Sequence, residues 1–414
     1  MKKPPVAHAP WIRLCVISVS LPMVIMLAVL AFAWPAGRIA PRDLPVGIVG
    51  ANAAGQQAVE GLAHSKPGGF DFHLYSDEGA ARSAIRQRDV YGAFVVTPGD
   101  ITVLEASAAG PAVAQLLGTA GQQLRSHASQ QAAASAHAKA AGTGSHRAAR
   151  GGAAGAGRST GHPPANISPP KVVHVKTVDV VATSADDPRG LVFSSALLPL
   201  TICGVIIAAA IALLPGFRAA WHRVVALPVV CAVAGLGVHL VAQGFLGALP
   251  HETAATWGAL SLTLLAISAT TAGLVSVVGP AGFGLGAALM VFVGNPFSGV
   301  TSAPQLLPKA VGSIGQWLPP GAGASLLRST AYFNGNGSAE HLAVLALWGV
   351  LGLAATLLGR RAPAGSAPAP AGSTPAPEGT QATWQTLPDD LPGTQAQTQD
   401  AGYPHARHAY GTDR

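Results

Sequence analysis

Charged residues are scarce in this chain. Asp, Glu, Lys and Arg make up 10% of its 414 residues, whereas hydrophobic residues make up 49% and the mean hydropathy is +0.39. A water-soluble domain of this length rarely combines so little charge with so much apolar character. The composition therefore argues against an ordinary soluble protein and indicates one that is embedded in a lipid bilayer. The basic residues are scattered and form no stripe interleaved with aromatic residues, so we predict no nucleic-acid partner.

Cysteine is scarcer still. The chain has three, Cys15, Cys203 and Cys231, and all of them fall within apolar runs. The long polar stretch between the first and second runs has none, which excludes a disulfide framework or a thiolate metal site there. A folded domain in this stretch must be held together by a hydrophobic core.

Signatures of common enzymes are also missing. The polar stretch has no serine elbow and no His-Glu-x-x-His pattern, and no Walker-type phosphate loop occurs in the chain. Four histidines, His127, His137, His146 and His162, lie nine to sixteen residues apart, which gives them no shared face for a metal ion. We therefore predict no enzyme activity, no cofactor and no metal site in this chain.

Long apolar runs are abundant. One stands alone at residues 14–34, and five crowd the second half, at 191–214, 224–246, 255–278, 281–300 and 339–359. Each is near the ~20 residues with which a helix crosses a bilayer. We predict an α-helical polytopic membrane protein with six transmembrane helices, one N-terminal and five C-terminal. An extracytoplasmic α/β domain lies between the first and second helices.

Basic residues indicate the orientation. They flank the first run, the loop after the second run and the end of the last run: Lys2, Lys3, Arg13, Arg218, Arg223, Arg360 and Arg361. By the positive-inside rule this face is cytoplasmic, so residues 1–13 and both termini lie in the cytoplasm and the protein resides in the cell membrane. The basic start and the sequence Ala31-Phe32-Ala33 also fit a cleaved signal peptide. The length of the run and the Trp34-Pro35 end favour a retained helix.

Short alternating segments predict the α/β domain at residues 35–124. Strands are expected at 46–49, 70–75, 91–96 and 101–105, and helices at 56–64 and 77–88. Asp77 or Ser76 is placed to cap the second helix. Apolar residues at helical spacing predict a third helix with Val113, Leu117 and Leu124 on one face.

Less regular composition marks three further segments. Residues 125–170, rich in Ala, Gly, Ser and His, predict an extended or partly helical linker, and residues 360–414 a disordered cytoplasmic tail. Residues 171–190 return to the membrane through a strand at 172–181, whose alternation slips between Lys176 and Val178 and so predicts a bulge. Residues 299–337 predict short helices lying at the outer interface, with Trp317 and Tyr332 as anchors.

Polar residues within the apolar runs are the candidate binding positions. Gly235, His239 and Gln243 form a stripe at helical spacing, and Asn295 comes after Gly282, Gly286 and Gly294 in the run at 281–300. Polar side chains inside a membrane tend to line a route for substrate. The alternative is helix packing, because small residues let helices approach and amides bond between them.

Three stretches carry a family resemblance. They are Leu44 to Asn52 after the first run, Ser76 to Val96 with its Tyr-Gly-Ala-Phe-Val-Val strand, and Asn295 to Tyr332 with its Leu-Pro-Pro step. Together they resemble the phage infection protein (YhgE/Pip) branch of the ABC-2 type transporter permease superfamily, over most of residues 10–360. The resemblance implies a five-helix membrane domain at 191–359 that pairs as a homodimer or heterodimer and works with a separate ATP-binding subunit.

The expected function is that of a permease-like subunit of an ABC-type exporter, which moves a lipophilic or surface-polymer substrate outward. Arg218, Trp221 and Arg223, in the loop after the second run, would contact the ATPase. The alternative is a non-transporting membrane protein whose external domain binds a surface or secreted partner, as receptors and secretion accessories of this branch do.

Overall fold

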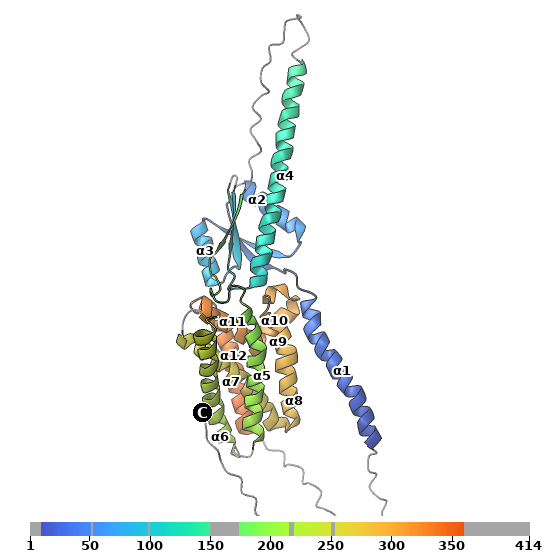
Figure 1. The fold of residues 1–414 in the computed structure, drawn as a ribbon, viewed down its shortest axis with the longest axis vertical. Helices are drawn as coiled ribbons and strands as arrows, with labels where there is room; N and C mark the ends of the chain where they lie inside the picture. The colour runs from blue at the N-terminus through green and yellow to red at the C-terminus, as the bar shows by residue number, and fades with distance from the viewer. Residues whose placement is uncertain are drawn as a thin grey trace, which may run out of the picture. The chain divides into compact units, whose positions relative to one another are not determined.

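A computed structural model describes residues 10–50, 53–97, 100–149, 174–214, 219–249 and 253–359. It combines a small α/β domain with a bundle of apolar helices (Figure 1). Predictions that fall on residues 1–9, on the second part of the linker from 150 to 173, on Arg218 or on the tail from 360 lie outside the described residues.

Five strands form the sheet of the α/β domain. They are β1 (Leu44–Val49), β2 (Phe70–Tyr75), β3 (Gly92–Thr97), β4 (Asp100–Glu105) and β5 (His174–Asp179), in the order β2-β1-β3-β4-β5. β1 pairs in parallel with β2 and β3, and β4 in parallel with β5, whereas β3 and β4 are antiparallel. Parallel neighbours require crossover connections, which α2 (Ala53–Ser65) and α3 (Glu78–Gln87) provide. The five predicted strands are confirmed.

The bulge predicted in β5 is wrong. β5 pairs with β4 without interruption, from His174 opposite Asp100 to Asp179 opposite Glu105. The strand lies at the edge of the sheet, and none of its six residues is fully buried. Its loose alternation therefore reflects an edge position, which makes weak demands on side-chain pattern, rather than an extra residue in the ladder.

Helices cover both faces of the sheet. α2 and α4 (Pro111–Ala149) pack on one face, where Leu62, Phe94 and Leu117 are buried together. α3 packs on the other face through Ala81, Ala84 and Ile85, and the carboxylate of Asp77 caps it by accepting from the Ala80 amide at 2.8 Å. α4 continues to Ala149, so the predicted linker begins as an extension of this helix.

Four helices in the described part of the chain are long and apolar enough to cross a membrane. They are α5 (Leu191–Leu213), α6 (Ala220–His239) with its π-helical continuation η1 (Leu240–Phe245), α7 (Thr253–Val278) and α12 (Ala339–Leu358). The first and fifth predicted spans lie in α1 (Pro10–Ala36) and in the succession α8 (Ala281–Ala287), η2 (Ala288–Gly294) and α9 (Asn295–Phe297). Their apolar helical stretches, Pro22–Ala36 and Ala281–Phe297, are shorter. The chain is thus a multi-pass membrane protein, and the count of six spans stays a prediction.

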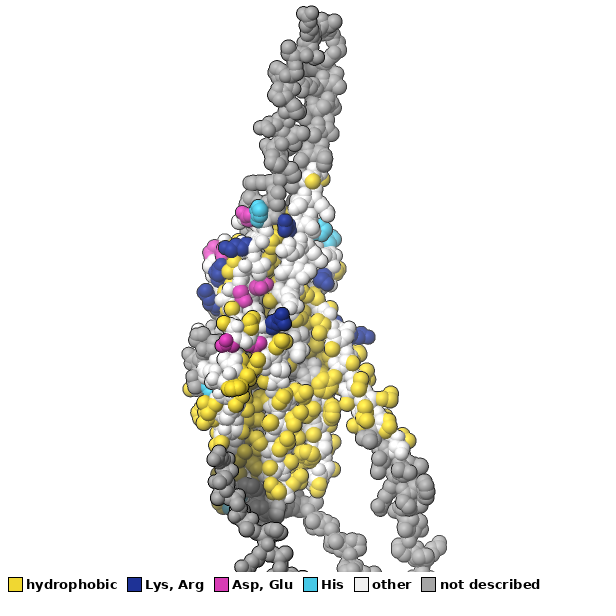
Figure 2. Space-filling model, viewed as in Figure 1, with side chains coloured by type: hydrophobic (Ala, Val, Ile, Leu, Met, Phe, Trp, Pro, Cys, Tyr) yellow, Lys and Arg dark blue, Asp and Glu magenta, His cyan; other side chains and the backbone are white. Residues whose placement is uncertain are grey.

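The surface agrees with this assignment. In Figure 2, hydrophobic side chains cover the helical bundle, whereas Lys, Arg, Asp and Glu gather over the α/β domain. Large apolar side chains such as Val233 and Val350 on the bundle are more than 60% exposed. Such a surface is stable in lipid and costly in water.

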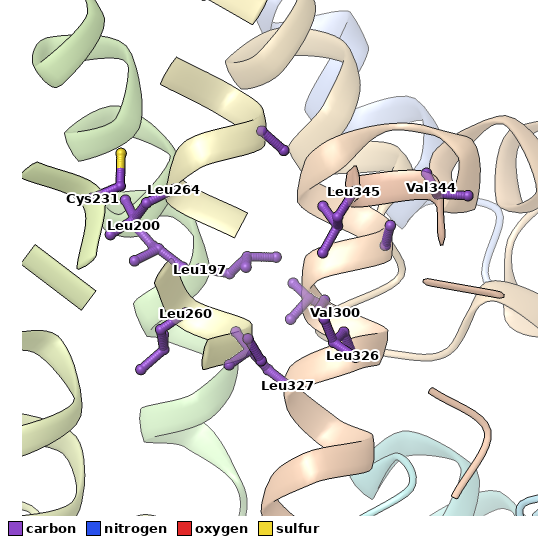
Figure 3. Packing of buried hydrophobic residues seen from close by; sticks show 14 residues of the cluster. Leu197, Leu200, Cys231, Leu260, Leu264, Val300, Leu326, Leu327, Val344 and Leu345 are labelled. Atoms are coloured by element: carbon purple, nitrogen blue, oxygen red, sulfur yellow. The ribbon is translucent and has the colours of Figure 1, made fainter. Parts of the chain in front are cut away.

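α7 occupies the centre of the bundle. Its most apolar stretch is 67% buried, against 22–44% for the other three candidate spans. Leu260 and Leu264 on α7 pack with Leu197 of α5 and Leu345 of α12 in the cluster of Figure 3. The helices of the bundle therefore share one apolar core around α7.

Residues 299–337 form the predicted short helices, η3 (Pro304–Leu306), α10 (Lys309–Trp317) and α11 (Pro319–Tyr332). α11, however, does not lie along an interface, because it is buried from Pro319 to Ala331 and packs between α7 and α12. Its small residues allow that close packing. Trp317 is 60% exposed, as an interfacial anchor would be.

This segment also joins the bundle to the α/β domain. Leu306 and Ala303 belong to the same buried cluster as Phe94 and Leu117 of the sheet and α4. The carbonyl of Leu306 accepts from the backbone amide of Ala40 at 3.0 Å and from the Arg42 guanidinium at 2.7 Å. Residues 303–306 thus connect the helical bundle to the α/β domain through buried apolar contacts and hydrogen bonds.

We expect Phe94→Ala to destabilise the α/β domain by about 3–5 kcal/mol, because this fully buried ring lies between the sheet and α4. Thermal unfolding of the full-length protein in detergent measures the effect. Leu74→Ala is the control, because Leu74 on β2 is 72% exposed and should change stability by less than about 0.5 kcal/mol. Equal losses in the two variants would contradict the packing described.

Candidate functional site

His239 and Asn295 carry buried polar atoms in the membrane bundle that have no partner among the described residues, as does Oγ of the partly buried Ser261. His239 is 1% exposed and Asn295 is 7% exposed. Neither ring nitrogen of His239, nor Nδ2 of Asn295, has a hydrogen-bond partner among the described residues. A buried polar group without a partner costs free energy and is rare in native structures. These two side chains are therefore the strongest binding candidates within the bundle.

The backbone is unusual at both positions. His239 is the last residue of α6 before the π-helical segment η1, and Asn295 directly follows the π-helical segment η2. Such segments are rare and are frequently found at functional sites. Both lie at the end of the bundle that carries α10 and α11. The chain after η1 accepts a hydrogen bond from Tyr332 at Ala248, and Gly294 packs on Pro320.

Three hydroxyls of α7 are satisfied locally. Thr263, Ser268 and Thr271 of α7 donate to the carbonyls four residues earlier, at 2.7 to 2.9 Å. This back-bonding removes the need for a partner on another helix. These three hydroxyls therefore have the partner that the nitrogens of His239 and Asn295 lack, whereas Oγ of Ser261 on the same helix is buried with no partner among the described residues.

The glycines of the predicted stripe serve helix packing. A Cβ at Gly235 would lie 2.4 Å from Oγ and 2.9 Å from the backbone nitrogen of Ser261 on α7. A Cβ at Gly286 would likewise lie 2.7 Å from Cγ2 of Thr271. Gln243 is half-buried in η1. Gly235 therefore has a role in helix packing, which is the alternative to a substrate route.

The predicted coupling residues separate in the structure. Trp221 is 60% exposed and stacks against the His222 ring, with centroids 3.9 Å apart. Arg223 is 6% exposed, so its side chain turns into the bundle, and Arg218 lies outside the described residues. Of Trp221 and Arg223, Trp221 is thus the residue that is exposed to a partner.

A second site lies where the α/β domain meets α10, α11 and α12. It is a cavity of about 320 Å³, and its polar lining includes Arg88, Tyr91, Gln305, Ser325, Arg328 and His341. Arg88 donates to the Ser325 carbonyl at 3.1 Å and to the Ser329 hydroxyl. Tyr91 donates to Oε1 of Gln305 at 2.6 Å, and Arg328 donates to the Val300 carbonyl at 3.1 Å.

Burial shapes the ionisation of this cavity. It lowers the pKa of Arg88 and raises the pKa of Tyr91. At neutral pH the phenol is neutral, because its pKa is raised from an already basic value, and the arginine is charged, because a guanidinium is not deprotonated in proteins. The cavity therefore carries positive charge.

Sequence reasoning missed this cavity. Its two arginines are 240 residues apart in the chain, and no motif connects them. The one local signal is Arg328 itself, a charge within the apolar run of α11. A charge in such surroundings is costly unless the fold supplies a polar environment.

No group of three His, Cys, Asp or Glu side chains is placed to hold a metal ion within the described ranges. Comparison of the chain with family models, with curated proteins and with solved structures finds no match. The resemblance to ABC-2 type permeases therefore stays a prediction.

We expect Gly235→Ala to destabilise the bundle by about 1–3 kcal/mol, because the new methyl group meets the backbone of Ser261. Gly237→Ala in the same helix is the matched control, since nothing lies within 4 Å of its Cβ position. In thermal unfolding experiments in detergent, the control variant should be at least as stable as the wild type. Equal stability of the two variants would contradict the packing role.

Proposed function

We propose that this chain is the permease-like subunit of an ABC-type exporter, which moves a lipophilic or surface-polymer substrate outward. The supporting observation is the pair of buried, unpartnered polar side chains, His239 and Asn295, inside a bundle of apolar helices. A polar group of a passing substrate would supply the hydrogen bonds that these nitrogens lack. The apolar surroundings would accept the rest of a lipophilic molecule.

Energy for export would come from a second protein. The sequence contains no Walker-type loop, so the proposal assigns ATP hydrolysis to a separate ATP-binding subunit. Trp221 is the proposed contact. α5 begins beside the α/β domain and runs 23 residues away from it, so the start of α6 lies at the opposite end of the bundle. With the α/β domain outside, Trp221 faces the cytoplasm, where such a subunit works.

The working unit in this proposal is a dimer, either of two copies or of this chain with a related one. The exposed apolar side chains of α6 and α12 offer surfaces for pairing within the bilayer. The remaining apolar surface of the dimer would contact the lipid bilayer.

Transport is tested with ethidium, a lipophilic cation, as the probe. In cells that express the chain with its ATPase, we expect His239→Leu and Asn295→Leu to slow ethidium efflux about tenfold, because each removes a group that bonds the substrate. Thr270→Val is the matched control, since its hydroxyl is satisfied by the Ala266 carbonyl at 2.7 Å. Immunoblots check that all variants reach the membrane. Wild-type efflux in both leucine variants would contradict the assigned route.

The partner is tested by cross-linking and affinity purification, with mass spectrometry to identify a protein that carries a Walker loop. We expect Trp221→Ala to lower recovery of this ATPase several-fold, because a large exposed aromatic ring is a typical contact anchor. Trp317→Ala is the matched control, being equally exposed, at 60%, at the other end of the bundle. Suppose that the wild-type protein recovers no ATPase and that deletion of the gene for this chain leaves efflux unchanged. These results would favour the alternative, a non-transporting protein whose external domain binds a surface or secreted partner.

A further inference from the structure

Two guanidinium groups face the junction cavity without an acidic partner. The three ion pairs in the described part of the chain join His73 to Asp71, Arg82 to Glu78 and Lys309 to Asp43. Neither Arg88 nor Arg328 takes part in one. Glu340 lies on the cavity rim, but it is exposed and is not within ion-pair distance of either arginine. The cavity therefore has an excess of positive charge.

Both arginines are nevertheless deeply placed. Arg328 is 4% exposed and Arg88 is half-buried. Burial and the neighbouring charge of Arg88 lower the pKa of Arg328 to about 10, so both groups stay charged at neutral pH. Two like charges in a partly buried site repel each other, and an anion between them would remove that repulsion.

The fold holds these side chains in position. Backbone carbonyls accept one hydrogen bond from each arginine, at 3.1 Å in both cases. The guanidinium of Arg88 lies over the Phe333 ring at 5.4 Å, and that of Arg328 lies over the Phe193 ring at 5.0 Å. A guanidinium has five N–H groups, so most of them remain for a ligand. The site is thus preorganised rather than formed by mobile surface residues.

Backbone conformation at Arg88 points the same way. This residue ends α3 in the left-handed region, with φ of 67°, where glycine is the usual residue. A side chain there adds local strain, which is typical of positions with a function. The lining also includes Tyr91 and His341, and Nδ1 of His341 is buried without a partner.

We propose that this cavity binds the phosphate group of an anionic ligand, with Arg88 and Arg328 as its principal contacts. Guanidinium groups match phosphate oxygens in a bidentate geometry. The volume of about 320 Å³ is at the lower end of the ~300–1,000 Å³ typical of small-molecule sites. This proposal does not depend on transport.

The place of the cavity indicates the source of the phosphate. Glu340 and His341 line it from the first turn of α12, a helix long enough to span the membrane. The site is therefore level with the end of a membrane helix, where lipid headgroups lie. A phospholipid or another lipid-linked phosphate fits this depth, and free phosphate shares the same chemistry.

Native mass spectrometry of the full-length protein in detergent tests the proposal with three probes: dioctanoyl phosphatidylglycerol, phosphate-free dioctanoylglycerol and inorganic phosphate. We expect Arg88→Gln and Arg88→Gly to weaken phosphatidylglycerol binding about tenfold or more, because a charge-assisted contact is lost. Arg88→Gly relieves the left-handed strain and so offers a second variant if the glutamine variant folds poorly. Arg86→Gln, which removes an exposed charge from the same helix, is the matched control and should bind as wild type does.

The outcomes are distinct. Binding of phosphatidylglycerol that depends on Arg88 and is not displaced by inorganic phosphate supports a lipid phosphate. Binding of inorganic phosphate with the same dependence on Arg88 supports the site with a soluble ligand. Equal binding of phosphatidylglycerol and dioctanoylglycerol would overturn the proposal. So would Arg88 variants that bind phosphatidylglycerol as tightly as Arg86→Gln does.

Discussion

The close approach of five helices to α7 is the contact on which the membrane bundle depends. Glycines on α5, α6, α8, α11 and α12 each face α7 so closely that a Cβ would lie within 3.0 Å of it: Gly204, Gly235, Gly286, Gly323 and Gly352. In a bilayer the hydrophobic effect does not drive helices together, so packing of this kind has to hold them. The small residues on the outer helices let those helices approach α7 closely, and this close approach is what buries α7.

Polar side chains in the bundle differ in whether they have a hydrogen-bond partner. Thr263 and Thr271 on α7 bond to carbonyls of their own helix, so these hydroxyls need no partner on another helix. His239 and Asn295 instead adjoin π-helical segments at the edge of the packed region, and their nitrogens stay unpartnered. The unpartnered nitrogens next to the π-helical segments are the groups that we assign to a ligand.

The junction between sheet and bundle is organised by the same segment that closes the bundle. η3 contributes Leu306 to the core of the α/β domain, while α11 is buried between α7 and α12. Arg88 from the sheet side and Arg328 from α11 meet in the cavity between them. A ligand at this point would contact both parts of the molecule at once.

The sequence by itself determined the membrane class, the strands and the capped helix at Asp77, because hydropathy and periodicity are local properties that neighbouring residues decide. It misjudged the edge strand β5, where half-exposure blurs alternation, and α11, whose small residues give no sign of the helices around it. Whether Gly235 packs or lines a route was open, since its meaning lies in the distance to Ser261. Tertiary structure alone decided that Arg88 and Arg328 share one cavity and that the ring nitrogens of His239 have no partner among the described residues. Those facts depend on distances between segments far apart in the chain, which no local pattern records.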